Sequence, residues 1–148
     1  MDKRINFHFE HPEDNIGYLL WQTTMQWQKQ MNRALDGVGL THTQFVIMAA
    51  LAWLLRSTAQ VTQKEIAEHS RTDRMMVSKI LRTLENNGLI ERKEHETDTR
   101  AKCVFLTDQG VNVLQEALKI KAKADALFFE KLEDEAQFAA ALRQVLLG

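Results

Sequence analysis

The 148-residue sequence predicts a mainly α-helical protein with one β-hairpin. Two observations lead to this fold class. Apolar residues recur at helical spacing before residue 88 and after residue 107, and several of these segments begin at a threonine suited to cap a helix. Only the segment from about residue 89 to 106 has the pattern of strands. We therefore expect a single protomer, residues 1–148, in which helices surround one short hairpin.

The first two helices are expected at about residues 13–36 and 41–56. The first ends in the sequence GVG. At the start of the second, Thr41 and Gln44 have the spacing of a capping box, and Leu40 and Phe45 that of a hydrophobic staple. The following run, FVIMAALAWLL (45–55), is apolar on all sides, which predicts a buried central helix.

The third and fourth helices are expected at about residues 62–69 and 72–87. Thr62 and Glu65 repeat the capping box, and Gly88 suits the left-handed position after a helix end. The fourth helix has an apolar stripe that should be buried, formed by Val77, Ile80, Leu81 and Leu84. Two strands, 89–93 and 101–106, then enclose the polar loop His95–Thr99 and predict a two-stranded hairpin.

The last two helices are expected from Thr107 and at about residues 133–147. Together with the N-terminal segment they carry more apolar residues than one small lobe can cover. These residues are Phe7, Phe9, Phe128, Phe129, Leu132, Phe138, Leu142, Val145 and Leu146. Interdigitated terminal helices in a two-fold symmetric dimer would bury them.

Bulk composition favours no class of function by itself. The net charge is −1, which gives no overall attraction to nucleic acid, although residues 61–104 contain nine Lys and Arg against eight Asp and Glu. The N-terminus has no apolar signal segment, and the longest apolar run is too short to span a bilayer. The single cysteine cannot form an internal disulfide. We expect a cytoplasmic protein with no membrane partner.

The central order of helix, short helix, tight turn, helix and hairpin is that of a winged helix-turn-helix, whose second helix enters the DNA major groove. The fourth helix has a second face that is polar and basic, where short hydroxyl side chains allow close approach and cations neutralise phosphates. The candidate DNA-contacting residues are Thr72, Arg74, Met75, Ser78, Lys79 and Arg82 on the helix and His95, Thr97, Arg100 and Lys102 on the hairpin. A basic helix face alone is more often a solvated surface, but the whole constellation favours DNA binding.

These motifs resemble the MarR family of bacterial transcription regulators over nearly the whole chain. The resemblance is carried by LTHTQFVIMAAL (40–51), TQKEIAE (62–68), VSKILRTLENNGLIER (77–92) and DTRAKCVFLTDQG (98–110). It implies a homodimeric winged-helix protein, usually a repressor, that binds double-stranded DNA at a short palindromic operator. It also implies a DNA-binding lobe at about residues 40–106, with dimerisation helices at about residues 1–36 and 107–148.

The resemblance further assigns residues 73–87 to the recognition helix and places the wing residue Arg100 in the minor groove. Asp98 would hold the guanidinium of Arg100 by a charge-assisted hydrogen bond. The alternative is that Asp98 only forms a turn and Arg100 is solvated.

Regulation by a small ligand, oxidation or metal is also implied by the family. Peroxide-sensing relatives use a cysteine near the N-terminus, where this chain has none, and we interpret Cys103 as a packing residue. Zinc-sensing relatives use one histidine that His42 matches, but Asp108 and Asn112 stand at the other two ligand positions. Whether His8, His11 or His42 bind a metal stays open, and we expect no metal or other cofactor.

A small-molecule effector pocket is the remaining possibility, lying in the family between the dimerisation helices and the DNA-binding lobe. The candidate lining residues are Trp21 and Met25 on the first helix and Phe45 and Met48 on the second, with Trp27 and Trp53 nearby. Apolar and aromatic walls suit an aromatic ligand, although each of these residues can also be explained as core.

Three function hypotheses compete. The preferred one is a dimeric DNA-binding regulator. The second is a winged-helix protein-interaction module without DNA binding, which the near-neutral charge would allow but which needs no basic helix face or wing arginine. An enzyme is the third and the weakest, because the sequence contains no nucleophile–base pair, phosphate loop or complete metal set.

Overall fold

The computed structural model describes residues 1–98 and 100–148. The predicted loop His95–Thr99 ends at a residue that lies outside these described ranges. In chain order the elements are η1 (Pro12–Asp14), α1 (Ile16–Leu35), η2 (Asp36–Val38), α2 (His42–Leu54), β1 (Val61–Thr62), α3 (Gln63–Ser70), α4 (Arg74–Asn86), β2 (Ile90–Glu94), β3 (Lys102–Leu106), α5 (Asp108–Phe128) and α6 (Glu135–Leu147). The predicted helices are all present, with ends shifted by one to three residues.

Local hydrogen bonds explain where the helices begin. Both predicted capping boxes are confirmed: the Thr41 hydroxyl accepts from the Gln44 amide at 3.1 Å, and the Thr62 hydroxyl accepts from the Glu65 amide at 3.2 Å. α1 begins later than expected because the Asn15 side chain caps it and a 3-10 turn precedes that residue. Gly88 has φ +77°, the left-handed conformation predicted for it.

The sheet differs from the expected two-stranded hairpin. A third, two-residue strand, β1, pairs antiparallel with β3 through Val61–Val104 and Thr62–Cys103, giving the order β1-β3-β2. Two residues are too few to produce a strand pattern in the sequence, and here they overlap the capping box of α3. The extra pairing fixes the start of α3 beside the base of the hairpin.

The main core lies where α2 packs against α3, α4 and the sheet. Ile47, Met48 and Leu51 of α2 are fully buried, as is Ile66 of α3. The stripe predicted on α4 is confirmed, with Val77, Leu81 and Leu84 fully buried and Ile80 half-buried against the core. This packing turns the opposite face of α4 toward solvent.

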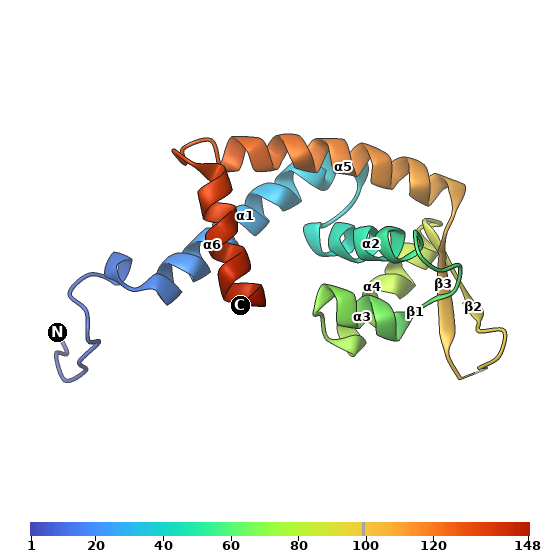
Figure 1. The fold of residues 1–148 in the computed structure, drawn as a ribbon, viewed down its shortest axis with the longest axis horizontal. Coiled ribbons are helices and arrows are strands. Elements are labelled where there is room, and N and C mark those ends of the chain that lie inside the picture. The colour runs from blue at the N-terminus through green and yellow to red at the C-terminus, as the bar shows by residue number, and fades with distance from the viewer. Residues whose placement is uncertain (99) are drawn as a thin grey trace.

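Figure 1 shows the winged lobe on one side of the molecule, with α1 and α5 extending away from it and α6 folding back from the far end of α5. Edge contacts between Phe128 and Phe129, and between Phe129 and Phe138, hold the start of α6 against α5. Among the described residues, no single helix is long and apolar enough to cross a bilayer; only α1 with η2 together with α2, bent by 76°, reaches that composition.

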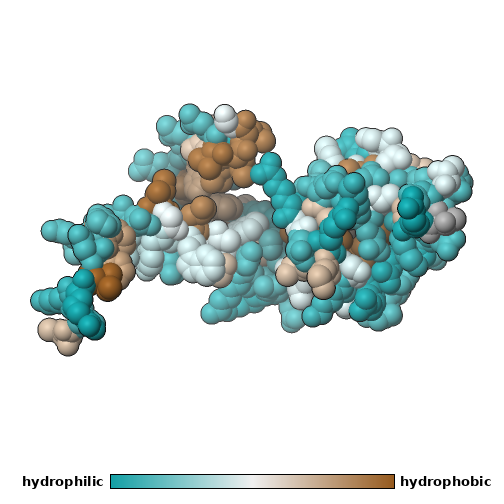
Figure 2. Space-filling view, turned by 90° about the horizontal axis from the view of Figure 1, so that it is seen from below, coloured by the Kyte–Doolittle hydropathy of each residue, from teal (hydrophilic) through white to brown (hydrophobic). Residues whose placement is uncertain are grey.

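The terminal helices expose the apolar side chains noted in the sequence. Val145 is 83% exposed, and Leu142 and Leu146 are also exposed. α1 adds Ile16 and Leu19 to the exposed set. Figure 2 shows hydrophobic residues gathered on this part of the molecule, whereas the winged lobe is mostly hydrophilic on the same face. Exposed apolar surface of this extent marks an interaction site.

Candidate nucleic-acid interface

The outward face of α4 carries the basic residues predicted to contact DNA. Arg74, Met75, Lys79 and Arg82 are exposed, and Ser78 is half-buried between them. The Asp73 carboxylate caps the helix by accepting from the Met76 amide at 3.1 Å. The first residues of the helix therefore have a fixed backbone, and their side chains are free to meet a ligand.

Thr72 lies before α4 rather than on its outward face. It is half-buried, and its hydroxyl donates to the Ser70 carbonyl at 3.2 Å. This bond closes the tight turn after α3, in which Arg71 has the left-handed φ of 53°. Thr72 thus shapes the junction between the two helices, and a DNA contact by its side chain stays a prediction.

At the wing tip, Asp98 is close to Arg100 in two ways. Its Oδ1 accepts from the Arg100 amide at 3.1 Å and lies 3.6 Å from Arg100 Nε. The Arg100 side chain is 94% exposed. Asp98 therefore forms the turn, whereas the guanidinium lies at ion-pair distance, beyond a hydrogen bond, and is solvated. A DNA contact by Arg100, held in place by Asp98, stays a prediction.

His95 organises the loop that leads to this tip. It is half-buried, and its Nδ1 accepts from the amides of Thr97 and Asp98 at 3.2 and 3.3 Å. Thr97 itself is exposed. The predicted DNA contact of His95 stays a prediction, but the ring already serves to hold the loop.

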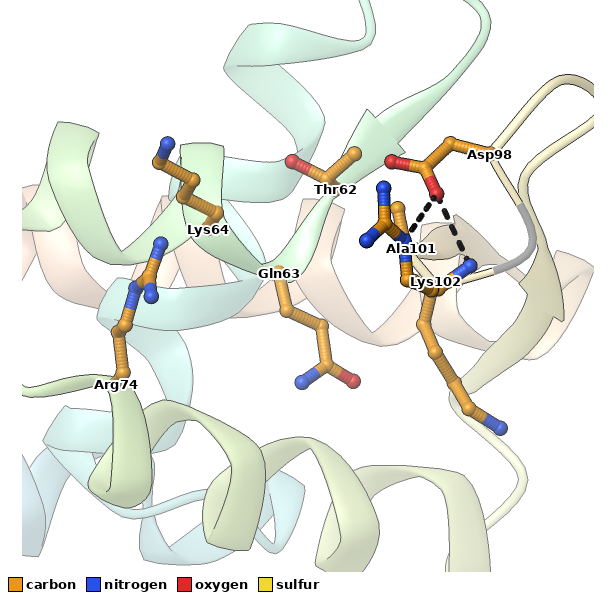
Figure 3. Close-up of a pocket in the computed structure, with 8 residues that line it drawn as sticks. Thr62, Gln63, Lys64, Arg74, Asp98, Ala101 and Lys102 are labelled. Carbon is orange, nitrogen blue, oxygen red and sulfur yellow. Dashed lines mark hydrogen bonds and ion pairs between the residues drawn. The ribbon is translucent and has the colours of Figure 1, made fainter.

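A basic groove lies between the helix pair and the wing. Its lining residues are Thr62, Gln63 and Lys64 of the β1–α3 junction, Arg74 of α4, and Asp98, Arg100, Ala101 and Lys102 of the wing (Figure 3). Four cations face one carboxylate, and the N-terminus of α3 adds its positive end. A phosphate backbone fits these charges.

Sequence reasoning missed Lys64 and Gln63. The signal was present in the capping box, because the residues after Thr62 stand in the first turn of a helix, where anions are favoured. What the sequence could not show is that β1 brings this turn beside the wing.

An ion pair joins the wing to α4. Arg92 of β2 donates from Nε and Nη2 to Glu85 Oε1 at 3.2 and 2.9 Å, and from Nη1 to Gln63 of α3 at 3.2 Å. Hydrogen bonding and attraction from Arg92 lower the pKa of Glu85. Three elements of the interface are therefore held together by one guanidinium.

A second polar cluster lies where α1, α2 and α5 meet. His42 is only 5% exposed, its ring meets Trp27 edge-on at 4.7 Å, and its Nε2 has no hydrogen-bond partner among the described residues. Asp125 accepts from Trp27 Nε1 at 2.8 Å and from Lys121 Nζ at 2.7 Å. Burial, and then the charge of Lys121, lower the pKa of His42, while Asp125 opposes this.

The structure divides the residues predicted to line an effector pocket. Phe45 and Met48 are buried in the core, whereas Trp21 is 61% exposed and Met25 is also exposed. Trp27 of α1 contacts α2 through the His42 ring, and Asn32 of α1 accepts from the His42 amide at 2.7 Å. A pocket formed by the four predicted residues stays a prediction.

The positions that match zinc ligands in relatives, and the single cysteine, are the remaining candidates for a sensing site. Asp108 and Asn112 are exposed at the start of α5, away from solvent-shielded His42. Residues 1–98 and 100–148 contain no group of three or more His, Cys, Asp or Glu placed to hold a metal ion. Cys103 is buried in β3, and burial raises the pKa of its thiol, which disfavours the reactive thiolate. Its role as a packing residue stays a prediction.

An outward basic helix, its paired partner helix and an arginine-tipped wing define a winged-helix DNA-binding protein. The MarR family model matches residues 40–102. The chain is 38% identical to the helix-turn-helix transcriptional regulator YdcH of Bacillus subtilis strain 168 over 138 residues, 93% of this chain and 94% of the relative. It belongs to the MarR family of transcriptional regulators; it is a DNA-binding regulator and not an enzyme.

Solved structures agree with this assignment. The S. aureus MepR–DNA complex has 25% identity and a TM-score of 0.77, and the match covers 89% of this chain and 96% of MepR. Bordetella bronchiseptica BpsR, whose DNA binding is regulated by 6-hydroxynicotinic acid, has 20% identity and a TM-score of 0.81, with 95% and 99% covered. Because BpsR is only 20% identical to this chain, its match shows a shared fold and nothing about the ligand of this chain.

Proposed function

We propose that this protein is a cytoplasmic repressor that binds a palindromic operator as a homodimer and is released by a small aromatic acid. The observation that carries the DNA part is the basic groove between α3, α4 and the wing, with Arg100 exposed at its outer end. Residues 40–106 are the DNA-binding lobe in this proposal, and residues 1–36 and 107–148 are the dimerisation helices.

The dimer is supported by the exposed apolar residues of α1 and α6, which a second copy would cover. With one recognition helix per chain, the two half-sites should lie about one helical turn, roughly 34 Å, apart. A two-fold axis relates the two recognition helices of such a dimer, so the two half-sites should form a palindrome.

The effector part rests on the cluster of Trp27, His42, Lys121 and Asp125. A carboxylate could exchange with Asp125 on the Lys121 ammonium while its ring packs on Trp27. The cluster joins α1 and α5 to α2, so a ligand there would change how the dimerisation helices meet the DNA-binding lobe. BpsR shows that a MarR-like fold can respond to an aromatic acid.

The experiment is a fluorescence anisotropy titration with a duplex from upstream of the chain's own gene, against a scrambled duplex of equal length. Lys64→Ala and Arg74→Ala should weaken binding, while Lys119→Ala, an exposed lysine on α5, should not. Adding 6-hydroxynicotinate or benzoate should release the wild type but not Lys121→Gln. Equal affinity for both duplexes would contradict operator recognition, and binding to neither duplex would favour the protein-interaction hypothesis.

A further inference from the structure

Met75 is a strongly exposed apolar side chain in a part of the chain where such residues are rare. It is 81% exposed as the second residue of α4. In residues 54–98 and 100–110, the one other exposed large hydrophobic residue is its neighbour Met76, which is 51% exposed. The remaining exposed apolar residues lie on the N-terminal segment, α1, the end of α2, and the α5–α6 region. Met75 is therefore not part of the proposed dimer surface.

The surroundings of Met75 are those of a nucleic-acid contact rather than a protein contact. It shares a shallow concave surface with Met76, Ser78, Lys79 and Arg82. Ser78 and Arg82 follow Met75 by three and seven residues, which places them on the same side of the helix. The small Ser78 leaves room beside the thioether, and the two cations suit flanking phosphates.

The edges of the base pairs offer one apolar group to such a side chain. In the major groove, guanine, cytosine and adenine present hydrogen-bond donors and acceptors, and thymine adds its 5-methyl group. A thioether has no donor and is a weak acceptor, so it cannot satisfy the polar edges. The first residues of a recognition helix are those that face the bases.

We propose that Met75 is a specificity-determining residue that selects thymine in each half-site by packing against its 5-methyl group. This inference rests on the proposed operator binding and adds to it the base that the start of α4 reads. The apolar area that Met75 leaves in water on the free protein is then covered in the complex.

Met76 provides the matched control. It has the same side chain, is also exposed and borders the same concave surface, but it follows Met75 by one residue and therefore leaves the helix about 100° further around the axis. Alanine is a good helix former at both positions, and neither side chain is buried.

The test replaces single thymines of one operator half-site with deoxyuridine, which removes only the methyl group. Operator affinity is measured at fixed salt for the wild type, Met75→Ala and Met76→Ala, with melting temperature as the folding control. At one thymine, the wild type and Met76→Ala should lose about fourfold in affinity, from the cost of exposing one buried methyl. Met75→Ala should bind the thymine and uridine duplexes equally.

Uridine sensitivity that persists in Met75→Ala, or that is lost in Met76→Ala instead, would overturn the inference while leaving operator binding intact. So would a wild type that is insensitive at every thymine. A wild type that binds no duplex specifically would overturn the proposed function, and the reading of thymine with it.

Discussion

Among single residues, the two arginines of the interface allow the sharpest comparison. Arg82 is exposed two turns into α4, and Arg100 is exposed beside Asp98 at the wing tip. Arg100→Ala should weaken operator binding by about 1–3 kcal/mol. Its effect should fall mainly on A·T-rich flanks, because a minor-groove contact reads groove width. Arg82→Ala should act within the half-site.

Both variants should melt within about 1 °C of the wild type, because exposed substitutions change stability little. Affinities at fixed salt for duplexes altered at the core or at the flanks separate the two effects. If Arg100→Ala binds like the wild type on all duplexes, the wing makes no contact of consequence.

His42 makes stability depend on pH. Its pKa in the folded protein lies below the ordinary 6.5, because the ring is buried near Lys121. As the pH falls from about 6.5 through the folded pKa, the unfolded chain takes up a proton that the folded chain does not, so stability is lost. Above pH 6.5 both forms are neutral and this contribution is constant.

Acidification from pH 7.5 to 5.5 should therefore lower the melting temperature of the wild type more than that of His42→Phe, which keeps an aromatic ring beside Trp27. His69→Phe changes an exposed histidine and is the control, with the acid sensitivity of the wild type. Equal acid sensitivity in wild type and His42→Phe would show that His42 does not titrate differently on folding.

At the scale of elements, local signals were readable in the sequence and long-range ones were not. Thr41 and Thr62 identified their helix starts because a cap and its partner are three residues apart. The apolar stripe of α4 predicted which face of the helix is buried. It therefore also predicted that the basic face on the other side is exposed to solvent. β1 was missed because two residues have no period, and Lys64 was missed because its place in the groove depends on that strand.

The Arg92–Glu85–Gln63 network was also beyond sequence reasoning, since its partners come from three elements. We expect Arg92→Met to lower the free energy of unfolding by about 1–3 kcal/mol, because the partly buried Glu85 carboxylate loses both guanidinium donors and keeps only the backbone amide of residue 92. Operator affinity should fall as well, because the wing is no longer fixed to α4. Urea denaturation and anisotropy measure the two effects.

The pair formed by Lys93 and Glu91 provides the comparison. Its nitrogen and oxygen are 3.7 Å apart and both side chains are largely exposed, so Lys93→Met should change stability by under about 0.5 kcal/mol. Similar losses in Arg92→Met and Lys93→Met would mean that general charge, rather than the network, stabilises the wing.

For the whole molecule, the exposed apolar face of the terminal helices predicts the assembly. Val145→Asp should leave the protomer folded, because this side chain has little contact within its own chain. It should abolish the dimer, because a carboxylate would be buried at the interface. Size-exclusion chromatography with light scattering measures the mass, and Gln144→Asp is the control. A dimer that survives Val145→Asp would place the interface elsewhere.

The central property proposed for this protein is the binding of one operator by two recognition helices. Native mass spectrometry of the protein with the duplex from upstream of its own gene measures this directly. We expect a complex of two chains per duplex that is lost on scrambling the sequence and weakens steeply as salt rises, since several Lys and Arg displace counterions. One chain per duplex, or no sequence-dependent complex, would contradict the account.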